Sequence, residues 1–141
     1  MGQDQGGAPQ AEPPKVEPRR DPLLLNELER NGMRNAGAFN AQLTDEVRKF
    51  VKPGITTKQI DDLVREYTVS HGHICATLNY RGNYPASCCT SVNDVICHGI
   101  PDDRALVDGD IVNLDVTIFL DGVHGDTNAT FAVGEVDDQS R

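Results

Sequence analysis

The sequence lacks both a long apolar run and an excess of basic residues. None of its apolar stretches approaches the ~18–20 residues that a transmembrane helix needs. Across 141 residues, 22 Asp and Glu outnumber 13 Lys and Arg, which gives a formal net charge of −9. Nucleic acids and anionic membrane surfaces both favour basic proteins, so this charge argues against either partner. The length and the hydrophobic fraction of 38% indicate one domain with a modest core.

The first 21 residues also lack the apolar segment of a secretory signal peptide. They are rich in Gly, Pro, Gln and Glu, a composition that cannot bury enough apolar surface to offset the entropy of ordering. We therefore predict a disordered tail over residues 1–21. Because no signal peptide is visible, we expect a cytoplasmic, reducing location.

The four cysteines lack the spacing of a zinc site, since two of them are adjacent rather than separated as in CxxC. Disulfides are rare in reducing compartments, so we expect small buried thiols at all four positions. These are Cys75, Cys88, Cys89 and Cys97.

Two helices are predicted in the first half of the chain. Apolar residues recur at three- and four-residue steps after Pro22, until Pro53-Gly54 ends the pattern. Thr56 and Gln59 form a capping box that begins a second helix. The apolar face of the first helix comprises Leu28, Ala36, Phe39, Leu43, Val47 and Val51, and its first part is weakened by Gly32 and Gly37.

The second half indicates antiparallel strands. A strand is expected over residues 90–96, and a hairpin is expected where residues 111–120 and 123–133 flank Asp121-Gly122. A two-residue turn at that point places Thr117 opposite Asp126. Because side chains alternate between faces, Asp115 and Asp126 become diagonal neighbours on one face, with Cβ atoms about 7 Å apart.

Two carboxylates that converge in this way repel each other, unless a cation neutralises them. Oxygen ligands suit divalent ions, so Asp115 and Asp126 are candidate metal ligands. The alternative is the solvated face of an ordinary hairpin, and geometry alone leaves both interpretations open. His98 is similarly open between a structural role and proton handling, as is His124. The remaining acids of this region are predicted to be turn or surface residues: Asp108, Asp110, Asp121, Asp137 and Asp138.

Three segments of the second half carry specific motifs: SCCTSVNDVICHGIPDD (residues 87–103), DGDIVNLDVT (108–117) and DGVHGDTNATFAVGEV (121–136). In this order and at this spacing they resemble type I methionine aminopeptidases, and the similarity runs from about Glu27 to Val136. The resemblance implies an α+β pita-bread fold with two pseudo-symmetric halves around a dinuclear metal site. This chain would hold the N-terminal half, two helices followed by antiparallel strands, over residues 22–136, with 137–141 as a truncated linker.

The resemblance also implies roles for individual residues. Asp115 matches an aspartate that binds one metal ion, Asp126 matches one that bridges both, and His98 matches the catalytic histidine that contacts the substrate beside the scissile bond. The cofactors would be two divalent ions, with Co, Mn, Fe and Zn as candidates. Thr117 matches a hydroxyl near the bridging water, and Tyr80, Tyr84 and Cys89 match the methionine pocket.

The activity so implied is removal of the initiator methionine from nascent polypeptide N-termini by a metal-activated hydroxide, and contact with the ribosome is left open. The remaining ligands of the family, one His and two Glu, would lie beyond residue 141. Three interpretations therefore stand. The chain is an incomplete part of the catalytic domain that needs a C-terminal half, or a non-catalytic half-fold binding module, or a protein that self-associates around the pseudo-twofold axis.

Overall fold

A computed structural model describes residue 21, residues 23–138 and residue 140. The predicted tail over residues 1–21 lies almost wholly outside the described residues. Two helices come first, α1 (Glu27–Phe50) and α2 (Thr57–Ser70), as the apolar periodicity indicates. No helix among the described residues is long and apolar enough to cross a membrane.

Both helices begin with a capping box. At α1, the Asn26 side chain accepts a hydrogen bond from the Glu29 amide at 2.8 Å, and the Glu29 carboxylate accepts one from the Asn26 amide at 2.8 Å. The same reciprocal pair joins Thr56 and Gln59 at α2, which confirms the predicted start of that helix. The apolar face of α1 is shorter than expected, because Leu28 is 80% exposed.

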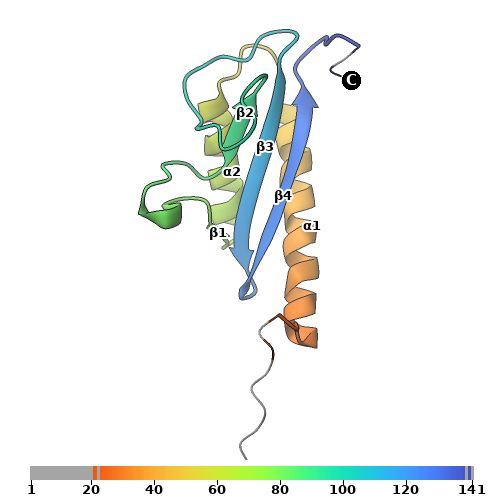
Figure 1. Cartoon of the computed structure of the whole chain (residues 1–141), viewed down its shortest axis with the longest axis vertical. Helices are drawn as coiled ribbons and strands as arrows, with labels where there is room; N and C mark the ends of the chain where they lie inside the picture. Colours follow the sequence, from red (N-terminus) through yellow and green to blue (C-terminus); the bar gives the residue numbers. More distant parts are fainter. Residues whose placement is uncertain (1–20, 22, 139, 141) are drawn as a thin grey trace, which may run out of the picture.

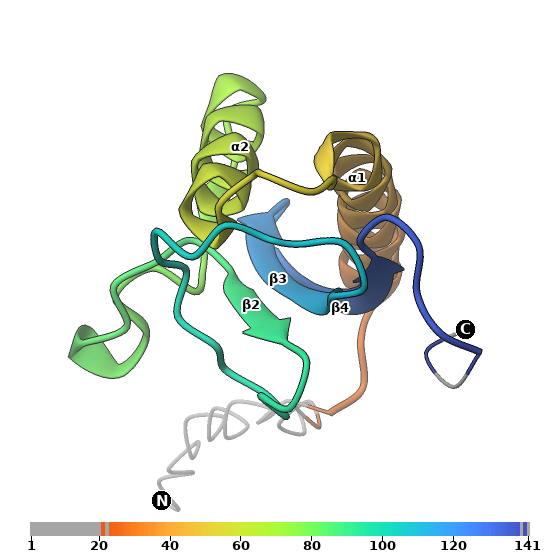
Figure 2. The same cartoon turned by 90° about the horizontal axis from the view of Figure 1, so that it is seen from above.

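The strands form one antiparallel sheet in which β3 pairs with each of the other three strands. A 3-10 turn over Tyr80–Gly82 lies between β1 and β2. Both α-helices pack on one face of the sheet, and neither of them covers the other face (Figures 1 and 2). The strands are β1 (Ile74–Cys75), β2 (Cys89–Val92), β3 (Ile111–Leu120) and β4 (Val123–Ala132).

The hairpin register follows the sequence prediction. Leu120 pairs with Val123, and Thr117 pairs with Asp126. The turn residues Asp121 and Gly122 both have positive φ, 50° and 77°, as a two-residue turn of this kind requires. The helix-facing side chains of β3 are all buried: Val112, Leu114, Val116, Ile118 and Leu120.

Two glycines allow α1 to approach the hairpin closely. A Cβ on Gly125 would lie 2.8 Å from the Cβ of Ala36, and a Cβ on Gly32 would lie 3.2 Å from the Asp121 carbonyl oxygen. Gly32, which weakens the helical pattern in the sequence, is therefore placed where the helix meets the turn. The tight contact holds β4 against α1 and fixes the position of the polar face.

Two predictions about the region after β2 are wrong. The expected strand over residues 90–96 ends at Val92, because Asn93 adopts a positive φ of 53° that turns the chain. Ile96 is then 94% exposed, and Cys97 is exposed rather than buried. The other three cysteines are buried, as expected.

Asp110 is also not the surface residue that its Asp-Gly-Asp context suggested. Its side chain is buried, and it accepts hydrogen bonds from the Val107 amide at 3.0 Å and the Asn93 side-chain amide at 2.7 Å. Arg104 forms an ion pair with it at 3.2 Å. Burial alone would raise the pKa of Asp110, but these hydrogen bonds and the Arg104 charge hold it below its ordinary value. The carboxylate joins the β2–β3 connection to the start of β3.

Candidate active site

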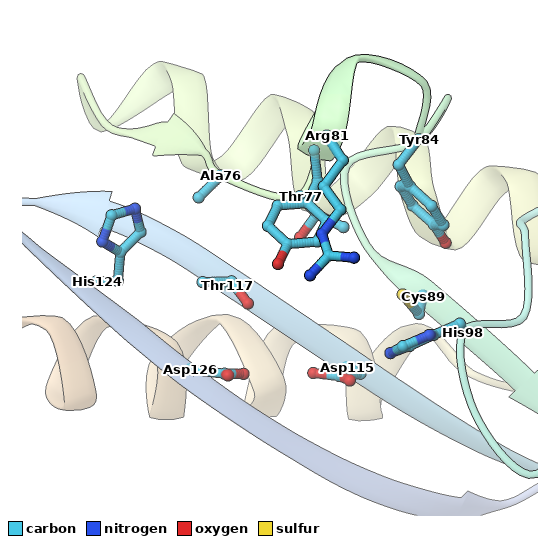
Figure 3. A pocket seen from close by; sticks show the side chains of 11 residues that line it. Ala76, Thr77, Arg81, Tyr84, Cys89, His98, Asp115, Thr117, His124 and Asp126 are labelled. Carbon is cyan, nitrogen blue, oxygen red and sulfur yellow. The ribbon is translucent and has the colours of Figure 1, made fainter.

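The face of the sheet opposite α1 and α2 carries a pocket of about 590 Å³ (Figure 3). All seven site residues expected from the sequence line this one pocket, although they are spread over residues 80–126 of the chain. Its lining comprises Ala76, Thr77, Tyr80, Arg81, Tyr84, Cys89, His98, Asp115, Thr117, His124 and Asp126.

The two candidate metal ligands project from neighbouring strands into the floor of the pocket. Asp115 lies on β3 and Asp126 lies on β4, opposite Thr117 in the register. Figure 3 shows both carboxylates on the same side of the hairpin, with Thr117 beside them. The shared face predicted from strand alternation is therefore present.

The electrostatics of this pair favour a cation. The pKa of Asp115 is raised, first by its burial and then by the negative charge of Asp126, while His98 opposes the shift. The ion pairs identified among the described residues include neither aspartate. Two convergent carboxylate groups fit the oxygen preference of divalent ions. Within the described part of the chain, however, no group of three or more His, Cys, Asp or Glu side chains is placed to hold a metal ion.

His98 is held at the pocket by an unusual backbone. Its φ is 56°, a left-handed conformation that is uncommon outside glycine. The next residue, Gly99, packs so closely on β2 that a Cβ would collide with the Thr90 carbonyl oxygen. The Thr90 amide donates to the Gly99 carbonyl at 2.8 Å, and the Gly99 amide donates to the Ser91 hydroxyl at 3.1 Å. These contacts place the imidazole beside Cys89 and Asp115 (Figure 3).

Tyr84 and Cys89 form the wall near His98. The Tyr84 hydroxyl donates to the carbonyl oxygens of Cys88 at 3.1 Å and Gly99 at 3.2 Å, so it bridges two segments of the wall. Burial raises the pKa of the Cys89 thiol, and the charges of Asp115 and Asp126 raise it further, against a lowering contribution from Tyr84. The thiol is therefore an apolar, protonated surface at neutral pH.

Some pocket residues were not identified from the sequence. Arg81 has a positive φ of 50° in the 3-10 turn and places its guanidinium 5.5 Å from the centre of the Tyr80 ring. Its place in the sequence between two expected pocket residues, Tyr80 and Tyr84, could have indicated that Arg81 also lines the pocket. A periodicity pattern does not reveal the conformation of such a loop. His124 was left open between two roles, and it lines the pocket while packing against Phe119 at a ring distance of 4.9 Å.

Comparison with known proteins decides the family. Residues 31–141 match the model described as "Metallopeptidase family M24". The chain belongs to this metallopeptidase family. It is 54% identical over 109 residues to a methionine aminopeptidase 2 of Mycobacterium tuberculosis, with 77% of this chain and 38% of the relative covered. It is 45% identical over 135 residues to a chloroplastic/mitochondrial methionine aminopeptidase 1D of Arabidopsis thaliana, with 92% and 38% covered.

Solved structures agree. The methionine aminopeptidase of Rickettsia prowazekii aligns with a TM-score of 0.74 and 48% identity, over 76% of this chain and 43% of that one. The Thermotoga maritima enzyme aligns with a TM-score of 0.78 and 34% identity, over 82% and 47%. The resemblance to methionine aminopeptidases and the α+β pita-bread fold are thus confirmed. The chain spans about two fifths of the length of the curated relatives named above.

Proposed function

We propose that this chain supplies the part of a methionine aminopeptidase that carries two metal-binding carboxylates and the wall of the methionine pocket. The complete enzyme would remove the initiator methionine from nascent polypeptide N-termini. One observation carries the proposal. Asp115 and Asp126 lie side by side in a pocket that His98, Tyr84 and Cys89 also line, in a chain of the M24 family.

The metal ions would be held by oxygen. Asp115 and Asp126 are the ligands that this chain offers. Burial and then the charge of Asp126 raise the pKa of Asp115, and a divalent ion would relieve the repulsion between the two carboxylates. When bound, such ions polarise a carbonyl group and lower the pKa of water. The carboxylate pair accepts Mn, Fe, Co or Zn without distinguishing among them.

The remaining pocket residues would hold the substrate. His98 would contact the amide beside the scissile bond. The contacts of Gly99 with β2 hold His98 in its left-handed backbone conformation and so keep the imidazole next to Asp115. The Thr117 hydroxyl would donate or accept a hydrogen bond beside the carboxylates. Tyr80, Tyr84 and Cys89 offer aromatic and sulfur surfaces, which suit the thioether of a methionine side chain.

A non-catalytic binding module is the second candidate function. The observation that favours it is the ligand count, because among the described residues no group of three or more His, Cys, Asp or Glu side chains is placed to hold a metal ion. Metal affinity rises with the number of preorganised ligands, so a complete site requires further groups. The cytoplasmic location and any contact with the ribosome stay predictions.

A chimera separates the two candidates. The segment of the Rickettsia enzyme that matches this chain would be replaced by this chain's own residues, and methionine release from a Met-Ala-Ser peptide would be measured with Mn²⁺. We expect the folded chimera to release methionine, and we expect Asp126→Ala to abolish release by removing a metal ligand.

The matched control is Asp45→Ala, which changes an exposed carboxylate on α1 whose ion pair with Arg48 is long, at 4.0 Å. This variant should keep full activity. A chimera with native-like circular dichroism and no methionine release would contradict the proposed function. Normal turnover by the Asp126→Ala chimera would contradict the metal role of that residue.

A further inference from the structure

Asp61 is a buried carboxylate that the proposed function does not use. It lies on α2 and is 8% exposed. Its Oδ1 atom accepts hydrogen bonds from the amides of Ser87 at 2.7 Å and Cys88 at 3.1 Å, and the Cys88 thiol lies 3.5 Å from the same atom. A single charged oxygen thus binds two consecutive backbone amides, which fixes the local backbone more firmly than a neutral acceptor would.

These two amides belong to the wall of the pocket. Cys88 directly precedes Cys89, whose side chain lines the pocket. The Cys88 carbonyl in turn accepts the Tyr84 hydroxyl, which also donates to the carbonyl of Gly99. Gly99 follows His98. A continuous set of hydrogen bonds therefore runs from α2, through the backbone of Ser87 and Cys88, to the loop that carries the imidazole.

Burying the Asp61 carboxylate costs free energy, which indicates that its contacts with the two amides have a role. A buried carboxylate loses hydration, and among the ion pairs of the described residues none includes Asp61. An apolar residue at this position would avoid that cost, but it would leave the Ser87 and Cys88 amides without their acceptor. The adjacent Asp62 is exposed and lies 3.9 Å from Lys58. An aspartate on α2 can therefore remain at the surface, and the burial of Asp61 is specific to its position.

We propose that Asp61 is a positioning residue of the pocket, which acts through Ser87 and Cys88 on Cys89, Tyr84 and His98. We name four hydrogen bonds the Asp61 brace. Two run from the Ser87 and Cys88 amides to Asp61, and two run from the Tyr84 hydroxyl to the carbonyls of Cys88 and Gly99. The brace keeps the Cys89 thiol against the pocket and the Tyr84 ring at a fixed distance from His98. Its importance for methionine selection rests on the proposed function, but its geometry does not.

The brace can be tested on the chain itself, without metal or activity. Each cysteine would be followed by mass spectrometry during alkylation with iodoacetamide, and amide hydrogen exchange of β3 would report global opening in the same samples. Cys89 is 5% exposed, whereas Cys97 is exposed and serves as an internal reference. We expect Asp61→Ala to raise the alkylation rate of Cys89 about tenfold, because two buried amides lose their acceptor. The rate at Cys97 should stay unchanged, and the exchange of β3 should rise by much less than the alkylation rate of Cys89.

Three further variants distinguish positioning from general stability. Asp61→Asn keeps an acceptor oxygen without the charge, so it should rescue most of the effect and leave a rise of about threefold. Asp62→Asn should match the unaltered chain. Val64→Ala opens a core cavity on the same helix, so it should speed β3 exchange and Cys89 alkylation in parallel.

Tyr84→Phe tests the second half of the brace. Removing the hydroxyl should speed alkylation of Cys89, while exchange of the Ser87 and Cys88 amides stays slow because Asp61 still binds them. An unchanged Cys89 rate in Asp61→Ala, or a rise that only parallels faster β3 exchange, would overturn the proposal.

Addition of free L-methionine separates this inference from the proposed function. Protection of Cys89 by methionine in the unaltered chain would support the methionine pocket, and its absence would count against that pocket alone. The response of Cys89 to Asp61→Ala in the absence of methionine decides the brace by itself.

Discussion

Two carboxylates, one just before β3 and one in its middle, lie in opposite electrostatic environments. Asp110, just before the strand, is surrounded by the Val107 amide, the Asn93 side chain and Arg104, and its pKa is lowered. Asp115, five residues later, lies beside Asp126 in the floor of the pocket (Figure 3), and its pKa is raised by burial and by the charge of that neighbour. The first carboxylate has partners for its charge within the described chain. The second is placed beside another negative charge, in a position that a bound cation would stabilise.

This difference shows how a structural acid is distinguished from a candidate metal ligand. Burial is not the criterion, because Asp110 is more buried than Asp115. The criterion is whether the surrounding groups satisfy the charge. Satisfied carboxylates stabilise the fold, whereas a convergent pair destabilises the metal-free protein and is available to a ligand.

The largest effect is expected at the structural acid. Asp110→Ala removes the acceptor of two hydrogen bonds and the partner of Arg104, and should lower the free energy of unfolding by about 3 kcal/mol. Urea denaturation followed by circular dichroism measures this change. Asp103→Ala, an exposed acid on the same connection, should stay within about 0.5 kcal/mol of the unaltered chain. Equal losses of unfolding free energy in the two variants would contradict the structural role of Asp110.

In the pocket, loss of a carboxylate is expected to stabilise the metal-free chain rather than destabilise it. Asp115→Asn removes one of two repelling charges, so it should raise the free energy of unfolding of the metal-free chain at pH 7. Since the side chain is partly open to solvent, the gain should stay below about 1 kcal/mol. The same urea titration, with EDTA present, provides the measurement. A clear loss of stability would show that Asp115 has a stabilising partner in the metal-free state.

The two acids should also differ in pH dependence, which is the smallest of these effects. The lowered pKa of Asp110 contributes stability above its unfolded value of about 3.8, and this contribution disappears as the pH falls through the lower folded value. The raised pKa of Asp115 has the reverse sign, so stability decreases as the pH rises from about 3.8 through its folded value. Stability curves between pH 3 and pH 7 should therefore show Asp110→Asn below the unaltered chain and Asp115→Asn above it. Both differences should shrink toward acid pH.

The hairpin was predictable from local chemistry. Asp121-Gly122 dictates a two-residue turn, and strict alternation then determines that Asp115 and Asp126 share a face. The metal-site hypothesis needed no tertiary information beyond this register. Pocket residues outside the hairpin, such as Tyr84 and His98, are assigned through the family resemblance rather than through any periodic pattern.

The errors lie where tertiary contacts decide the outcome. The sequence predicts a turn or surface role for Asp110, and this is wrong because the fold brings its partners Asn93 and Arg104 to it. The strand after Cys89 was drawn too long because a left-handed Asn93 ends it. Asp61 was not identified at all, since an acid on an amphipathic helix usually faces solvent and its contact with Ser87 spans 26 residues.

A Mn²⁺ titration followed by electron paramagnetic resonance tests whether Asp115 and Asp126 bind one cation together, as we propose. The signal of free Mn²⁺ would be recorded for the unaltered chain, Asp115→Asn, Asp126→Asn and the surface control Asp45→Asn. We predict weak binding, with a dissociation constant of about 1 mM for a site with so few ligands, that either pocket variant abolishes and the control keeps. Undiminished Mn²⁺ binding after loss of either pocket carboxylate, or no binding by the unaltered chain, would contradict the account.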